Sequence, residues 1–96
     1  MSKKLTQVEW LRARLEAGFV ENQSTMLKAF IGNHTDCVSK LRKIYEKEGK
    51  GYGYIKTWNR PARNPRTGAI THVAEYFIEE KVMDSELRRM HKRGRV

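Results

Sequence analysis

The spacing of apolar residues changes once along the chain, close to Gly51. Before this point apolar side chains recur every three or four residues, the spacing of one face of a helix. After it they alternate with polar ones, first over 51–58 and again over 69–78, which is the spacing of a strand. Helices followed by strands, in a chain of 96 residues, predict one small domain of the α+β class.

Two helices are expected in the first third of the chain. Thr6 and Glu9 have the spacing of a capping box, and Gly18 is suited to the left-handed conformation that ends a helix. A second, shorter helix is predicted to begin near Ser24 or Thr25 and to end at Gly32-Asn33, residues that tolerate a positive φ.

A third helix is expected over 35–48, with Thr35 as its N-cap and Gly49 closing it. The apolar positions form one stripe that should face the core: Cys37, Val38, Leu41, Ile44 and Tyr45. The opposite face is polar and mixes basic with acidic residues, with Arg42 at its margin: Asp36, Ser39, Lys40, Lys43 and Glu46.

The two alternating runs predict a β-hairpin, because residues 59–68 between them are rich in turn formers. This loop carries Arg60, Arg63 and Arg66 and no acid. The last stretch, 81–96, has few apolar anchors, so it is expected to be either a short helix or a basic tail.

The net charge of +9 is unevenly distributed. Residues 36–68 hold nine basic and three acidic side chains, and residues 81–96 hold six and two. The second strand run and the two residues after it, 69–80, hold three acids and neither lysine nor arginine. Such an excess favours a polyanionic partner, and composition alone does not separate DNA, RNA and acidic proteins.

A helix about 10–12 Å across fits the major groove of B-DNA with its polar side chains directed at the bases. A basic hairpin beside it can reach phosphates or a narrow, electronegative minor groove. The third helix and the hairpin loop therefore predict a surface that binds double-stranded DNA.

The order helix, helix, turn, helix, strand, basic loop, strand from Thr6 to Ile78 resembles the winged helix-turn-helix superfamily, in its small single-domain bacterial and phage forms. The resemblance implies a domain over 1–80, three helices followed by a two-stranded wing, and a separate tail over 81–96. It makes 35–48 the recognition helix and 59–68 the wing. The implied DNA contacts are Thr35, Ser39, Lys40, Arg42 and Lys43 on the helix, Arg60, Arg63 and Arg66 in the wing, and Arg88, Arg89, Lys92 and Arg93 in the tail.

Other chemistry has weaker support in the sequence. His34 and Cys37 lack further partners for a metal site, and Cys37 is expected to be a small buried residue. No catalytic constellation stands out, so neither an enzyme nor a cofactor or small-molecule ligand is expected. Tyr52, Tyr54 and Trp58 on one strand face could stack on RNA bases, although core packing is the favoured interpretation.

The sequence-level prediction is a cytoplasmic DNA-binding protein, without a membrane segment, that pairs as a homodimer on DNA. A small transcriptional regulator or a recombination accessory factor of a bacterium or phage would have this form. The alternatives are a module that binds an acidic protein through the same scaffold, and the RNA-binding module. The target sequence and the regulated process stay open.

Overall fold

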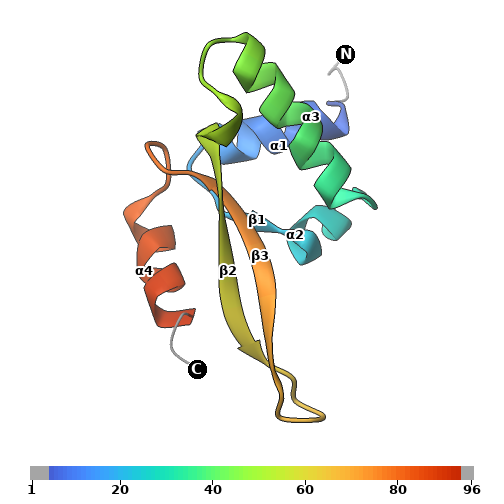
Figure 1. Ribbon diagram of the computed structural model, residues 1–96, viewed down its shortest axis with the longest axis vertical. Coiled ribbons are helices and arrows are strands. Elements are labelled where there is room, and N and C mark those ends of the chain that lie inside the picture. Colours follow the sequence, from blue (N-terminus) through green and yellow to red (C-terminus); the bar gives the residue numbers. More distant parts are fainter. Residues whose placement is uncertain (1–4, 94–96) are drawn as a thin grey trace.

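The computed structural model describes the backbone of residues 5–93 and the side chains of residues 5–89 (Figure 1). This part of the chain forms four α-helices and a three-stranded antiparallel sheet, so the predicted α+β class is confirmed. The helices are α1 (Gln7–Glu16), α2 (Gln23–Lys28), α3 (His34–Lys47), the 3-10 turn η1 (Tyr52–Tyr54) and α4 (Asp84–Arg93). The strands are β1 (Glu21–Asn22), β2 (Ile55–Arg63) and β3 (Ile70–Ile78). The region after residue 80 thus contains a helix.

The start and end of α1 are as predicted. Thr6 Oγ1 accepts a hydrogen bond from the Glu9 amide at 3.1 Å, and the Thr6 amide donates to Glu9 Oε1 at 2.9 Å. At the other end Gly18 has a φ of +95°. Leu11 and Leu15 on the inner face of α1 are fully buried.

The second helix begins at Gln23, close to the predicted start near Ser24, but its predicted end was wrong. Asn22 is the N-cap, because its Oδ1 accepts from the Thr25 amide at 3.0 Å while the Asn22 amide donates to Thr25 Oγ1 at 2.9 Å. The helix ends at Lys28, and the positive φ that turns the chain belongs to Phe30, at +62°, instead of Gly32. Sequence reasoning assigned this role to glycine because a bulky side chain rarely adopts it.

Helix α3 begins one residue earlier than predicted and is capped by Asn33, not by Thr35. Asn33 Oδ1 accepts from the Asp36 amide at 3.1 Å, and Thr35 Oγ1 donates to the same oxygen at 3.0 Å. The predicted inner stripe is confirmed, with four of its residues buried and Ile44 partly buried against the core.

The sheet has the order β1-β3-β2, with β3 in the centre. The predicted strand over 51–58 was wrong in its first half, because Gly51 turns the chain at a φ of +93° into η1. Strand β2 then continues through Arg63, so half of the predicted loop 59–68 is strand. Pro61 is tolerated there because β2 is an edge strand, whose outer backbone groups need no ladder partner.

The core lies between helices α1–α3 and the near end of the hairpin. Its buried members on the sheet are Ile55, Tyr76 and Ile78. The hairpin projects from this core along the 45 Å long axis, and α4 lies on the other side of the hairpin from α1–α3 (Figure 1). No helix among residues 5–93 combines the length and apolar character that crossing a bilayer requires.

The start of α4 is held against the end of α1. The Met83 amide donates to the carbonyl oxygen of Gly18 at 3.1 Å. A Cβ atom on Gly18 would lie 2.6 Å from the Lys81 carbonyl oxygen and 2.8 Å from Met83 Cγ. Gly18 is therefore required twice, by its left-handed backbone and by this close approach.

Candidate nucleic-acid interface

The exposed face of α3 carries three lysines at helical spacing, Lys40, Lys43 and Lys47. They border an open cleft of about 410 Å³ between α3 and the N-terminal end of α1. Lys40 Nζ pairs with Asp36 at 3.1 Å, and both side chains are more than half exposed. The structure thus brings two predicted contact residues, Lys40 and Lys43, onto one basic surface and adds Lys47, which sequence reasoning left out.

The predicted contacts Ser39 and Arg42 lie against the hairpin side of α3. Arg42 Nη2 donates to the Ile55 carbonyl oxygen at 3.0 Å and to Thr57 Oγ1 at 2.7 Å. Ser39 Oγ lies 3.3 Å from the Tyr52 hydroxyl oxygen. These contacts attach α3 to the segment that leads into the hairpin, so in the free protein Arg42 is a link between elements.

One arginine, Arg12, pairs with two acidic side chains where α1 meets α3. Arg12 of α1 holds Glu48, just after α3, through two hydrogen bonds of 2.7 and 2.8 Å, and it also bonds Glu16 at 2.7 Å. The hydrogen bonds from Arg12 hold the pKa of Glu48 below its ordinary value. The Arg12 guanidinium in addition lies 4.9 Å from the ring centroid of Tyr45, which fixes α1 against α3.

Arg60 lies within β2 and not in a loop. Its Nε is 3.6 Å from Oε1 of Glu75, a carboxylate that is only 1% exposed in the central strand. Trp58 is the direct cross-strand neighbour of Glu75, which places Arg60 diagonally on the same sheet face. Because its own side chain is 21% exposed, Arg60 is engaged mainly with this internal partner.

The remaining arginines of the hairpin reach solvent. Arg63 at the end of β2 is exposed, and its Nη1 donates to the Gly68 carbonyl oxygen at 3.3 Å. Arg66 is exposed at the tip, where its amide donates to Asn64 Oδ1 at 2.9 Å. The part of the predicted wing that remains a loop is therefore 64–68, with these two arginines beside and within it.

Two of the four predicted contacts in the C-terminal region can be placed. Arg88 and Arg89 are exposed on α4, and Arg89 Nη1 pairs with Glu86 Oε1 at 3.3 Å. The backbone of Lys92 and Arg93 belongs to α4, and their side chains lie outside the described part of the chain. Helix α4 lies across the hairpin from α3 (Figure 1).

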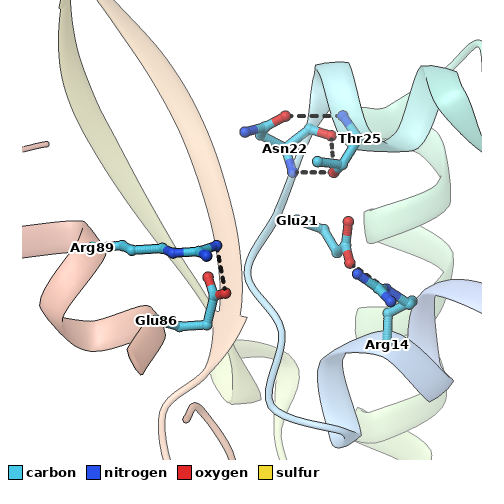
Figure 2. A network of polar contacts seen from close by, with 6 residues as sticks. All are labelled: Arg14, Glu21, Asn22, Thr25, Glu86 and Arg89. Carbon is cyan, nitrogen blue, oxygen red and sulfur yellow. Dashed lines mark hydrogen bonds and ion pairs between the residues drawn. The ribbon is translucent and has the colours of Figure 1, made fainter. Parts of the chain in front are cut away.

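Three buried carboxylates were missed by sequence reasoning: Glu21, Glu75 and Glu86. Glu21 accepts from Arg14 Nε at 2.7 Å, and Glu75 accepts from Asn22 Nδ2 at 3.2 Å. Figure 2 shows Arg14 and Glu21 on one side of β3 and Glu86 and Arg89 on the other. The acidic charge of the hairpin's return strand is therefore partly internal, because Glu75 balances basic side chains and is shielded from solvent.

The aromatic residues do not form the single strand face that was expected, and this correction follows from η1. Tyr54 packs edge-on against Tyr45, with ring centroids 4.8 Å apart, and its hydroxyl donates to Glu80. Tyr52 is 43% exposed, while Trp58 is half-buried. Cys37 is buried as predicted, and burial raises the pKa of its thiol.

Comparisons with known protein families, with curated sequences and with solved structures gave no match to this chain. The function is therefore argued from the geometry and charge described above.

Proposed function

We propose that the chain is a double-stranded-DNA-binding protein of the winged helix-turn-helix type, a transcriptional regulator or recombination accessory factor. In this proposal α3 enters the major groove, and the hairpin tip contacts the backbone or the minor groove. The order of the elements supports it: three helices precede the long hairpin, and α2 and α3 are joined by a short turn at 29–33.

The observation that carries the proposal is that several lysines and arginines are exposed, whereas nearby acidic side chains are paired with other arginines. Lys43, Lys47, Arg63 and Arg66 are exposed. Around them Glu48 is held by Arg12, and the buried Glu75 faces Arg60. Each pair leaves the net charge unchanged, but it occupies a carboxylate that could otherwise pair with these lysines and arginines, which therefore stay available to a phosphate backbone.

The dimensions define the DNA needed for a test. The long axis of 45 Å corresponds to about 13 base pairs of B-DNA at about 3.4 Å each. A duplex of about 25 base pairs would therefore cover α3 and the hairpin tip together. A homodimer, which we propose on DNA, would need about twice this contact length.

The test is fluorescence anisotropy of a labelled random duplex of about 25 base pairs with the full chain, over a range of salt concentrations. We expect binding at low salt, with a logarithmic slope of about 0.9 per phosphate contacted. Lys43→Ala should weaken binding, whereas Lys81→Ala, which changes an exposed lysine just before α4, should not.

Failure to bind the duplex at low salt, or equal effects of the two lysine variants, would contradict the proposal. Tighter binding of single-stranded RNA, lost in Trp58→Ala and Tyr54→Ala, would support the RNA-binding alternative instead.

A further inference from the structure

Phe30 presents a large apolar side chain to solvent from an unfavourable backbone conformation. It is 89% exposed and has a φ of +62°, the only positive φ of a non-glycine residue in the described part of the chain. The turn itself is needed, because the amides of Phe30 and Ile31 close the end of α2 on Leu27 and Met26 at 2.9 Å. Glycine or asparagine would adopt this backbone more easily, so folding does not account for the phenylalanine side chain.

A second exposed apolar side chain precedes Phe30 on α2, and the turn at Phe30 adjoins the start of α1, whose residues Thr6 and Val8 line the cleft. Leu27 on α2 is 52% exposed. Gln7 Nε2 donates to the Phe30 carbonyl oxygen at 3.3 Å, which brings the start of α1 next to this turn. Val8, the following residue, lines the cleft together with Ile44. We refer to Phe30, Leu27 and the cleft together as the Phe30 surface.

The rim of the cleft carries three lysines, of which Lys40 is paired with Asp36 at 3.1 Å. Lys40, Lys43 and Lys47 border the cleft. The carboxylate of Glu9, which also lines it, accepts a hydrogen bond from the Thr6 amide within the capping box. An occupant must therefore supply negative charge at the rim and aliphatic or aromatic side chains in the middle.

Charge and shape distinguish the candidate occupants. A second copy of this chain, docked through the same surface, would place lysines against lysines. A DNA backbone would satisfy the lysines and leave Val8, Ile44 and Leu27 uncovered. An amphipathic protein segment with acidic residues beside leucine or phenylalanine matches both features, in the manner of a helix lying in a groove.

We propose that the Phe30 surface docks an acidic, amphipathic segment of a partner protein, with Phe30 as its central anchor. This inference does not depend on DNA binding. Because Lys40 and Lys43 also belong to the proposed DNA-binding face, the acidic segment and duplex DNA would exclude one another.

The test is a selection from a display library of random peptides about 16 residues long, enough for about four helical turns, on the immobilised full chain. We expect the selected peptides to be rich in Asp and Glu with Leu or Phe at helical spacing. Phe30→Gly should weaken their binding about tenfold or more, while its thermal midpoint equals or exceeds that of the unchanged protein. Lys43→Glu should weaken binding as well.

The matched control is Ile70→Ala, which removes an apolar side chain that is 48% exposed on the hairpin and should leave peptide binding unchanged. A selection that enriches no acidic, apolar peptides, or peptides that bind Phe30→Gly as tightly as the unchanged protein, would overturn the inference. The same holds if duplex DNA, and no selected peptide, perturbs the amide resonances of Phe30 and Leu27. Since Phe30→Gly leaves all the lysines in place, retained duplex binding by this variant separates this inference from the proposed function.

Discussion

Arg42 of α3 donates a hydrogen bond of 2.7 Å to the hydroxyl oxygen of Thr57 in β2. The same nitrogen also donates to the Ile55 carbonyl oxygen at 3.0 Å. One guanidinium thus joins the middle of α3 to the first residues of β2. The angle between the proposed reading helix and the hairpin depends on this link.

Replacing Arg42 should cost stability, whereas replacing its neighbour Lys43 should not. Arg42→Ala removes two hydrogen bonds from a charged donor and is expected to lower the free energy of unfolding by about 1–3 kcal/mol. Lys43→Ala changes an exposed side chain and should stay within about 0.5 kcal/mol while weakening DNA binding. Urea unfolding measures both, and equal stability losses would show that Arg42 does not link the elements.

Gly18→Ala tests the attachment of α4 to α1. The added Cβ would meet Lys81 and Met83 at less than 3 Å from a residue whose φ is +95°, so we expect a loss of about 2 kcal/mol or more. Gly49→Ala is the matched control, because its φ is +84° with nothing within 4 Å of the new atom. It should cost only the backbone preference, about 1 kcal/mol. Thermal or urea unfolding would give the difference, which reports the contact with the loop before α4.

The Arg12–Glu48 pair makes stability depend on acid pH. Because the hydrogen bonds from Arg12 lower the pKa of Glu48 in the folded protein, the unfolded chain binds its proton first as the pH falls. The contribution is complete above the ordinary carboxyl pKa of about 4.3 and disappears as the pH falls through the lower folded value. Glu48→Gln should therefore be less stable than the unchanged protein at pH 7 and equally stable at about pH 2. A difference that persists at low pH would show a contribution other than this charge.

Specificity and affinity should separate between α3 and the hairpin tip. Lys43 lies on the exposed face of the helix proposed to read bases, so its replacement is expected to change which duplex is preferred. Arg63→Ala and Arg66→Ala should weaken all duplexes alike and reduce the salt slope by about one contact each. Selection of bound sequences from a random duplex pool, followed by salt titration, measures both effects. Identical behaviour of the Lys43 and arginine variants would mean that α3 is not a reading element.

Much of the fold follows from local sequence, and the exceptions have identifiable causes. The capping box at Thr6 and the inner stripe of α3 are short-range features, and both are confirmed. Strand β1 was missed because Glu21 and Asn22 have no strand propensity, and they pair only because β3 lies beside them. The alternation of Tyr52 and Tyr54 suggested a strand, but the glycine at 51 turns the backbone before β2 begins.

The basic residues of the candidate site could be predicted from the sequence, but the groups with which some of them pair could not. The exposed lysines of α3 and the arginines at 63 and 66 are visible in the sequence as a basic helix face and a basic loop. That Arg60 faces Glu75 depends on the register of β2 with β3, and that Arg42 bonds to β2 depends on helix packing. Neither is encoded in the spacing of residues along the chain. The spacing of Phe30 after Met26 and Leu27 indicates the apolar face of a helix, but α2 ends at Lys28 and the side chain is 89% exposed.

The far end of the hairpin extends away from the core and contributes no buried residues to it. Every residue from Pro65 to His72 is exposed, while the buried residues of β2 and β3 lie at the end next to the helices. Adding residues between Arg66 and Thr67 would leave the core intact, at a loop-entropy cost of about 0.6 kcal/mol for each doubling of the loop and the loss of the turn in which the Gly68 amide donates to the Asn64 carbonyl oxygen at 2.7 Å. The distance at which the tip contacts a target can change by insertion or deletion while the buried core stays the same. The length of the hairpin can therefore vary while its base stays anchored in the core at Ile55.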